Sequence, residues 1–144
     1  HNLFRCYTRG VFGKQMVVVE LPNGTYLRYN NLRAVLEDDQ QVYVYDQLKG
    51  REYVRSYIYG GKLVENVIQA LSFAVLKWQA LEMYKEGVVV KLNVHDEWVT
   101  CVPEAEVERT KQIIGDAMKR VPDYVKGLPV DCEVSSGVSY GDME

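Results

Sequence analysis

The feature that most constrains the fold is residues 62–86, a run without proline or glycine. Most of its residues are apolar, and Gln69 and Lys77 are among the few polar interruptions. A run of this length and composition is typical of a long, largely buried helix. Gly87 follows directly, at a position where glycine commonly ends a helix. We therefore expect one long helix to organise the chain.

The residues before this run predict a first β-hairpin. The β-branched run Val17-Val18-Val19 leads to Pro22-Asn23-Gly24, and an apolar, aromatic segment follows as far as Tyr29. Asn-Gly favours the positive φ angles of a type I′ turn, so we expect this hairpin within residues 15–29. Residues 30–40 are polar enough for a loop or a short helix.

A second hairpin is expected directly before the long helix. The apolar and aromatic residues 42–45 predict one strand, and residues 53–58 predict its returning partner. The polar residues 46–50 between them predict the turn. Gly60-Gly61 then separates the two hairpins from the helix.

After the helix, the pattern predicts a strand, a tight acidic turn and a returning strand. Residues 88–94 have the composition of a strand, His95-Asp96-Glu97 interrupts it, and residues 98–102 resume it. Pro103 stops the second strand. The three polar residues therefore lie at the tip of a hairpin.

The C-terminal part predicts a second helix and a last strand. Acidic residues crowd the start of residues 104–120, and Lys119 and Arg120 lie in the last turn, which favours the helix dipole at both ends. Residues 130–134 predict the strand. The expected fold class is α+β, an antiparallel sheet with two helices packed on one face, preceded by β-hairpins. A chain of 144 residues with 47% hydrophobic content predicts one compact unit.

The cysteines and the apolar runs limit the class of protein. Cys6, Cys101 and Cys132 are odd in number and far apart, which indicates neither a disulfide framework nor a zinc site and fits a reducing cytoplasm. No uncharged apolar stretch approaches the roughly 20 residues that span a bilayer, so no membrane partner is expected. The chain starts with His1 and not Met, without a leader pattern, which predicts a segment of a longer protein.

The charge argues against one class of function. A net charge of -3 and a pI of about 5.5 do not suggest a stand-alone nucleic-acid binder, because neutralising phosphates normally requires an excess of Lys and Arg. This balance leaves open an enzyme whose carboxylates hold metal ions, since the ions would bring positive charge to the substrate.

The turn His95-Asp96-Glu97 is the candidate chemical centre. Adjacent carboxylates in a tight turn repel each other and lose solvation, and a divalent cation would neutralise them. Oxygen ligands suit Mg²⁺. The alternative is an exposed polar turn, in which His95 is only a hydrogen-bonded turn residue. A lone histidine is a poor zinc ligand.

Two ordered motifs carry a resemblance to a known family. Residues 59–70, Tyr-Gly-Gly-Lys-Leu-Val-Glu-Asn-Val-Ile-Gln-Ala, precede Val94-His95-Asp96-Glu97 by about 25 residues. Together they resemble the long palm helix and the metal-binding turn of family A (polymerase I-like) DNA polymerases, of phage type in particular. Residues 21–29 are similar to the stretch leading from fingers to palm, and residues 128–142 to the C-terminal end. The likeness runs from about Leu21 onward.

The resemblance implies roles for four residues. Asp96 matches the second catalytic aspartate, a metal ligand, and Glu97 matches its acidic neighbour. His95 matches the residue near the primer terminus. Gln69 matches a glutamine that reaches the minor groove, where acceptors are present in every base pair. Without the resemblance, a polar residue bonded inside the core is the alternative for Gln69.

The implied activity is that of a DNA-directed DNA polymerase, which uses two Mg²⁺ ions to transfer a nucleotide to a primer 3′ hydroxyl. The implied partners are primer-template DNA, a deoxynucleoside triphosphate, and the remaining palm, fingers and thumb. Residues 1–58 would link fingers to palm, and residues 59–144 would form the C-terminal palm segment. Lys62, Arg55 and Arg51 are candidate phosphate contacts, with solvated surface residues as the alternative.

Departures from the family pattern limit what this chain does alone. Ala74 stands where relatives commonly have an aspartate, and Trp98 where a smaller aliphatic residue is usual. The first catalytic aspartate and the fingers helix have no counterpart, so the 144-residue chain alone is expected neither to extend a primer nor to bind Mg²⁺ tightly. A non-catalytic interaction or structural module is the alternative. A self-contained metal-dependent hydrolase is disfavoured by the lack of further carboxylate or histidine clusters.

Overall fold

The computed structural model describes residues 4–11 and 14–142. The chain divides into two compact units, residues 1–71 and 72–144, so the expectation of one compact unit is wrong. The physical reason is that the apolar residues form two separate clusters, one in each unit. The long helix α1 (Gly60–Lys85) contributes to both. The predicted boundary at residue 58 between a linking region and a palm segment stays a prediction.

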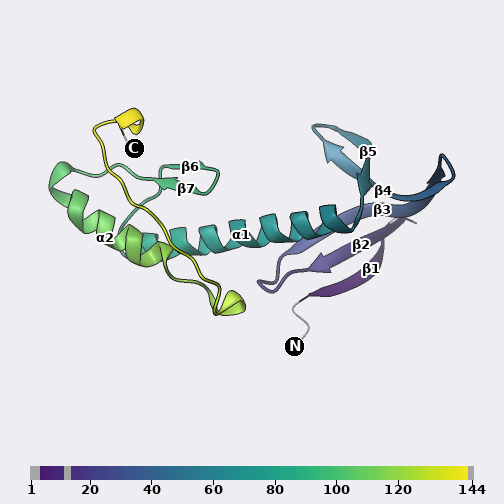
Figure 1. Cartoon of the computed structure of the whole chain (residues 1–144), viewed down its shortest axis with the longest axis horizontal. Helices are drawn as coiled ribbons and strands as arrows, with labels where there is room; N and C mark the ends of the chain where they lie inside the picture. Colours follow the sequence, from purple (N-terminus) through teal and green to yellow (C-terminus); the bar gives the residue numbers. More distant parts are fainter. Residues whose placement is uncertain (1–3, 12–13, 143–144) are drawn as a thin grey trace. The chain divides into compact units, whose positions relative to one another are not determined.

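The first unit contains a five-stranded antiparallel sheet (Figure 1). Its strands follow one another in the order of the sequence, each paired with the next. They are β1 (Arg5–Val11), β2 (Lys14–Glu20), β3 (Tyr26–Glu37), β4 (Gln40–Lys49) and β5 (Glu52–Ile58). Both predicted hairpins are therefore present, and β1 is a strand that the sequence patterns did not indicate.

The turn of the first hairpin differs from the predicted type I′ turn. Gly24 has a φ of 78°, and its N–H donates to the Leu21 carbonyl at 2.9 Å. The Leu21 N–H donates in turn to the Thr25 carbonyl at 2.8 Å. Pro22 explains the difference, because its fixed negative φ suits the first central position of a type I turn, and Asn23 is not left-handed. The left-handed Gly24 then completes a three-residue loop.

Residues 30–40 form a strand and a turn, so the predicted loop or short helix is wrong. β3 continues to Glu37, and the left-handed pair Asp38 and Asp39 (φ 49° and 59°) makes the tight turn into β4. Asp and Asn tolerate this conformation better than other side chains do. Asn31, also left-handed at φ 53°, marks a bulge in the register between β3 and β4.

The hydrophobic cluster of the first unit lies on one face of this sheet, and Val18 and Val44 are buried on the other face. Val19, Leu21, Tyr29 and Ile58 are buried together. Apolar residues from the first half of α1 pack against them, namely Leu63, Val67, Ala70 and Leu71. One sheet face is thus covered by helix.

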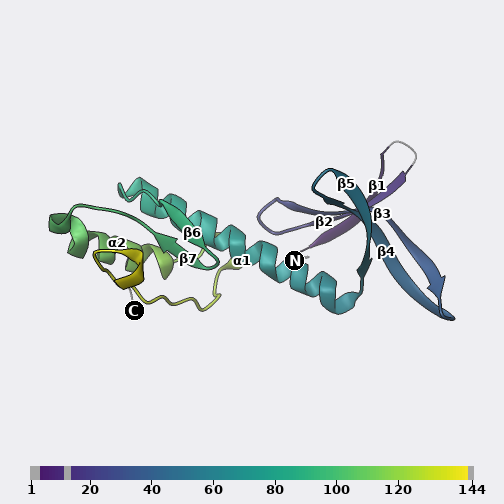
Figure 2. The same ribbon diagram turned by 90° about the horizontal axis from the view of Figure 1, so that it is seen from above.

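The second unit contains the rest of α1, a short hairpin and a second helix (Figure 2). The hairpin strands are β6 (Leu92–Val94) and β7 (Glu97–Val99), and the helix is α2 (Val107–Met118). Three single turns of 3-10 helix complete it, at Glu104–Glu106, Asp123–Val125 and Tyr140–Asp142.

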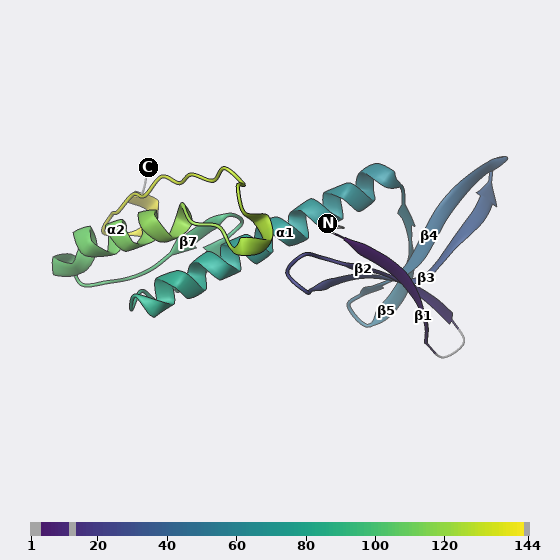
Figure 3. The ribbon, with the colours of Figure 1, turned by 90° about the horizontal axis from the view of Figure 1, so that it is seen from below.

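The core of the second unit joins these elements. Met83, Val88 and Ala117 are buried together, and Trp98 of β7 packs against them. Figure 3 shows α2 lying along this half of α1. The buried Gln79 donates through Nε2 to the carbonyls of Met118 at 2.7 Å and Arg120 at 3.0 Å, so it satisfies the open C-terminal end of α2.

Several sequence-based expectations are corrected in the second unit. The strands predicted at residues 88–94 and 98–102 are shortened to the three residues of β6 and of β7. The strand predicted at residues 130–134 does not form. The class α+β with antiparallel strands is confirmed, but the predicted single sheet with two helices on one face is replaced by two sheets, one in each unit.

The long helix forms as predicted but is not largely buried. Only Val75, Gln79 and Met83 are buried along it, whereas Val64, Ile68 and Leu81 are more than half exposed. Its apolar residues lie on all sides, and within each unit the covering elements contact one side. No helix in the described part of the chain is long and apolar enough to cross a membrane.

Gly87→Ala is expected to destabilise the chain by about 1 kcal/mol. Gly87 has a φ of 87°, and the N–H groups of Gly87 and Val88 donate to the carbonyls of Tyr84 and Met83, which closes the C-terminal end of α1. Alanine resists that φ. Gly60→Ala, at the first residue of the same helix with open space around it, should change the free energy of unfolding by less than about 0.5 kcal/mol. Urea unfolding measures the free energy of unfolding of both variants. An equal decrease in the two variants would contradict the prediction for Gly87.

Candidate functional site

The acidic turn is held by its own hairpin. Val94 pairs with Glu97, which leaves His95 and Asp96 as the two turn residues, and His95 is left-handed with a φ of 53°. The Asn93 side chain donates through Nδ2 to the carbonyls of His95 at 3.2 Å and Glu97 at 3.1 Å. The backbone of the turn is therefore braced by a side chain that precedes it.

The Asp96 carboxylate is open to a ligand. His95, Asp96 and Glu97 are all exposed. Within the described residues, no side chain or backbone group forms a hydrogen bond or ion pair with the Asp96 carboxylate. Two neighbouring carboxylates without a cationic partner offer oxygen ligands to a divalent cation.

This donor set fits part of a Mg²⁺ coordination shell. In the described ranges, no group of three or more His, Cys, Asp and Glu side chains is arranged to hold a metal ion. Mg²⁺ is commonly bound by one or two carboxylates together with waters and substrate phosphates. Asp96 and Glu97 are carboxylates of the kind that such a site uses.

Tyr140 contacts the acidic turn and was not identified from the sequence. Its hydroxyl donates to Glu97 Oε2 at 3.1 Å. Asp142 Oδ2 accepts from the Ser139 backbone N–H at 2.9 Å and from its hydroxyl at 2.7 Å, which closes the turn that carries Tyr140. The only sequence signal was the likeness of the tail to the C-terminal end of the polymerase family.

The Tyr140 contact predicts a pH dependence. The hydrogen bond to Glu97 and the negative charge of that carboxylate raise the pKa of Tyr140 above the ordinary value of 10.0. A raised pKa in the folded state means that this contact stabilises below pH 10 and is lost as the pH rises through the Tyr140 pKa. A ¹³C-tyrosine NMR titration should show a raised pKa that returns toward 10.0 in Glu97→Gln. An unchanged pKa in that variant would contradict the contact.

The predicted DNA contacts Gln69 and Lys62 meet at one carboxylate on α1. Glu65 Oε1 accepts from Lys62 Nζ at 2.9 Å and from Gln69 Nε2 at 3.3 Å. The hydrogen bond to Glu65 raises the pKa of Lys62. Gln69 is exposed, so the alternative of a glutamine bonded inside the core is wrong. The buried glutamine of this helix is Gln79.

The predicted phosphate contacts on β5 and its preceding turn are also exposed. Arg55 forms an ion pair with Glu37, and its guanidinium carbon lies 5.6 Å from the centre of the Tyr57 ring. Arg51 lies in the turn between β4 and β5. Arg55 and Lys62 thus each have a carboxylate partner that a phosphate would have to displace.

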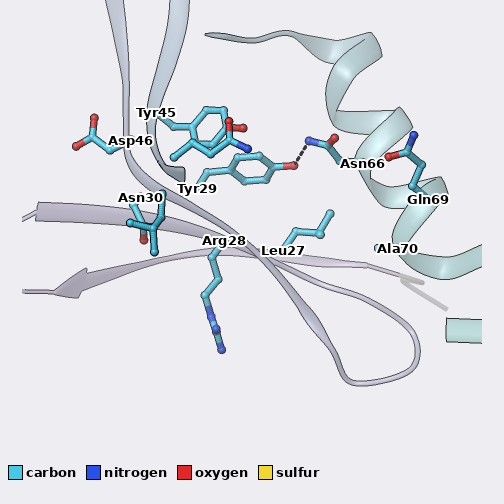
Figure 4. Close-up of a pocket in the computed structure, with 11 residues that line it drawn as sticks. Leu27, Arg28, Tyr29, Asn30, Tyr45, Asp46, Asn66, Gln69 and Ala70 are labelled. Atoms are coloured by element: carbon cyan, nitrogen blue, oxygen red, sulfur yellow. Dashed lines mark hydrogen bonds between the residues drawn. The ribbon is translucent and has the colours of Figure 1, made fainter. Parts of the chain in front are cut away.

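A hollow of about 390 Å³ opens beside Gln69 within the first unit (Figure 4). The buried Tyr29 lines the hollow, and its hydroxyl accepts a hydrogen bond from Asn66 Nδ2 at 3.0 Å. Burial raises the pKa of Tyr29. The ring of Tyr45 meets that of Tyr29 edge to face at 5.1 Å. The hollow therefore combines amide groups with aromatic rings.

Comparison with known proteins finds a distant relative. The chain is 29% identical over 138 residues to the DNA polymerase of Bacillus phage SP02. The chain is related to a phage DNA polymerase. The match covers 92% of this chain and 20% of that polymerase, so the chain spans about a fifth of the relative's length. No family model matches the chain. No solved structure matches it.

Proposed function

We propose that the chain is the C-terminal palm segment of a family A type DNA polymerase and that Asp96 is one of its catalytic metal ligands. The observation that carries the proposal is the exposed Asp96 carboxylate at a braced hairpin tip, which has no hydrogen-bond or ion-pair partner among the described residues. It lies within a chain related over nearly its whole length to a phage DNA polymerase. An enzyme that acts at a DNA end needs such an accessible acidic group.

The residues of this chain would have distinct tasks in nucleotidyl transfer. Bound Mg²⁺ would promote attack by the primer 3′ hydroxyl and neutralise charge at the reacting phosphate. Asp96 would hold a metal ion directly, and Glu97, oriented by Tyr140, would assist. His95 would lie near the primer terminus, and Gln69 would donate to minor-groove acceptors. The other catalytic carboxylate, the fingers and the thumb would come from outside residues 1–144.

Primer extension tests this proposal. The full protein is incubated with a labelled primer-template, one deoxynucleoside triphosphate at a time, and Mg²⁺. We expect incorporation only of the nucleotide complementary to the template, and none when Mg²⁺ is removed with a chelator. The 144-residue chain alone is expected to incorporate none. Absence of template-dependent incorporation by the full protein would contradict the proposal.

A non-catalytic interaction or structural module is the second candidate. It is favoured by the exposure of all three turn residues, because a solvated polar turn would look the same. The two candidates separate cleanly in the primer-extension assay, since a module without catalytic residues would not respond to substitution of Asp96. Template-dependent incorporation that depends on Asp96 would exclude the second candidate.

A further inference from the structure

Arginine and tyrosine alternate along three strands of the five-stranded sheet. The two-residue spacing places such side chains on the same side of a strand. The residues concerned are Arg5, Tyr7 and Arg9 on β1, Tyr26 and Arg28 on β3, and Tyr53, Arg55 and Tyr57 on β5.

The register of the sheet places these arginines and tyrosines of β1, β3 and β5 on one face. Tyr7 pairs with Val18, and Val18 pairs with Arg28. Directly paired residues of antiparallel strands point to the same side. Asn30, two residues beyond Arg28, pairs with Asp46, and Asp46 pairs with Arg55. The alternating residues of β1, β3 and β5 therefore share a face, which we call the Arg-Tyr face.

The bulge at Asn31 adds a further arginine to this face. Asn30 pairs with Asp46, and Arg33 pairs with Val44, so β3 uses three steps where β4 uses two. The extra residue restores the alternation, and Arg33 lies on the same side as Arg28 despite an odd spacing in the sequence.

The Arg-Tyr face is the side of the sheet that α1 does not cover within the first unit. Val19, Tyr29 and Ile58, which pack against α1, belong to the alternate positions. Figure 4 shows Tyr29 directed toward α1 and Arg28 extending to the other side of the strand. Tyr53 is 66% exposed and Tyr57 55% exposed. Aromatic rings of this size are left on the surface in the described structure.

Each of the three strands has an arginine placed over a tyrosine ring. The guanidinium carbon lies 5.6 Å from the ring centre for Arg9 and Tyr7, and 5.9 Å for Arg28 and Tyr26. The third pair is Arg55 and Tyr57, described above. Such contacts hold the arginine side chain along the sheet and leave its remaining donors for other ligands.

Five arginines share this face with three carboxylates, Glu20, Glu37 and Asp46, and this excess of positive charge favours an anionic ligand. Arg33 and Arg55 have carboxylate partners, Asp46 and Glu37. Arg5, Arg9 and Arg28 have no carboxylate within ion-pair distance among the described residues. The net negative charge of the chain is unevenly distributed. Residues 1–71 contain nine Lys and Arg and seven Asp and Glu, whereas residues 72–144 contain eight Lys and Arg and thirteen Asp and Glu.

We propose that the Arg-Tyr face binds single-stranded nucleic acid. Exposed tyrosine rings offer stacking platforms for bases. Arg5, Arg9 and Arg28, which have no carboxylate partner among the described residues, offer donors to the phosphates between them. Single-strand-binding surfaces use this combination. A duplex hides the faces of its bases in its own stack, so it could use only the arginines. An acidic peptide has no bases to stack. The proposal stands without the proposed function, because it uses only residues of the sheet.

Binding of fluorescent oligonucleotides to the full protein tests the proposal, with anisotropy as the readout. The probes are an oligo(dT) and an oligo(rU) of 20 nucleotides, a blunt DNA duplex and polyglutamate. We expect Tyr53→Leu/Tyr57→Leu to weaken oligonucleotide binding about tenfold or more. Tyr43→Leu is the matched control, because Tyr43 is 49% exposed on the opposite face of the same sheet, and it should leave binding unchanged.

A salt series tests the arginines separately. Replacing Arg5, Arg9 and Arg28 by glutamine should reduce the slope of log affinity against log salt by about 2 for single strands. Arg109→Gln on α2 is the control and should leave the slope unchanged. Tighter binding of either single strand than of duplex and polyglutamate supports the proposal, and the ratio of the two strands distinguishes DNA from RNA.

Three results would overturn the proposal. The first is equal affinity for single strands, duplex and polyglutamate. The second is a loss of oligonucleotide affinity in Tyr43→Leu as large as in Tyr53→Leu/Tyr57→Leu. The third is unchanged oligonucleotide affinity in Tyr53→Leu/Tyr57→Leu when circular dichroism shows that this variant is folded. Primer extension measured in parallel tests the proposed function. If the protein does not incorporate nucleotides but binds single strands through the Arg-Tyr face, the proposed function is wrong and the single-strand-binding proposal is not.

Discussion

Asp96→Ala in the full protein is expected to lower the rate of template-directed incorporation by about a thousandfold or more, with primer-template affinity changed less than about threefold. Asp96 has no partner in the described structure, so its removal breaks no contact that supports the hairpin. Its loss would instead remove a metal ligand that is needed in the transition state. A lower incorporation rate with unchanged DNA affinity is expected for a group that acts only in the transition state.

The measurement is single-turnover incorporation with saturating nucleotide, together with DNA affinity from anisotropy. Asp116→Ala, an exposed aspartate on α2, is the control and should leave the rate unchanged. Incorporation by Asp96→Ala within tenfold of the unmodified protein would remove Asp96 from the catalytic site. A parallel loss of DNA affinity would indicate a folding or binding defect instead.

Met83→Ala is expected to give the largest loss of stability, about 3 kcal/mol. Met83 is fully buried in the core of the second unit, where it packs with Val88 and Ala117. Truncation would remove its transfer free energy and leave a cavity between α1 and α2. Leu81→Ala, two residues away on the same helix and 59% exposed, should cost less than about 0.5 kcal/mol.

Urea unfolding followed by circular dichroism measures both variants. A similar loss in Leu81→Ala and Met83→Ala would show that the exposed side of α1 is buried in the protein by residues outside the described structure. A negligible loss in Met83→Ala would contradict the core assignment itself. Since the chain has two compact units, the variant's effect is read from the transition of the second unit.

The long helix was predictable because its evidence is local. The absence of Pro and Gly over residues 62–86 and the glycine at residue 87 fix its extent, and the structure places α1 at Gly60–Lys85 with a left-handed Gly87 after it. Its burial was not predictable in the same way. Burial depends on which distant segments cover each side, and apolar residues such as Val64 and Leu81 gave no indication that they would be exposed.

In the sheet, single turns and bulges determine where strands end and on which face a side chain lies, and the sequence patterns did not predict either. The tight turn at Asp38 and Asp39 converts an expected loop into the end of one strand and the start of the next. The alternation of arginine and tyrosine is visible in the sequence. The sequence does not show that Arg28 and Arg33 share a face, because this depends on the bulge at Asn31.

The candidate site was partly predictable. The acidic turn between two strands follows from local composition, and the structure confirms a hairpin with His95 and Asp96 at its tip. The contact between Tyr140 and Glu97 joins residues 43 positions apart, and no local pattern carries such information. The roles of Asp96 and Glu97 in metal binding remain predictions that rest on chemistry and on resemblance.

We expect the Asp96 turn to hold a divalent cation when DNA and nucleotide are bound. Fe²⁺ substituted for Mg²⁺ reduces added hydrogen peroxide to hydroxide and a hydroxyl radical, and added ascorbate returns the Fe³⁺ to Fe²⁺. The radicals cleave the protein backbone next to the bound iron, so the cleavage positions report where the metal binds. With primer-template and a complementary nucleotide, we expect cleavage within a few residues of Asp96, and we expect this cleavage to be lost in Asp96→Ala. An active protein cleaved elsewhere, with no cut near residues 94–98, would contradict the claim.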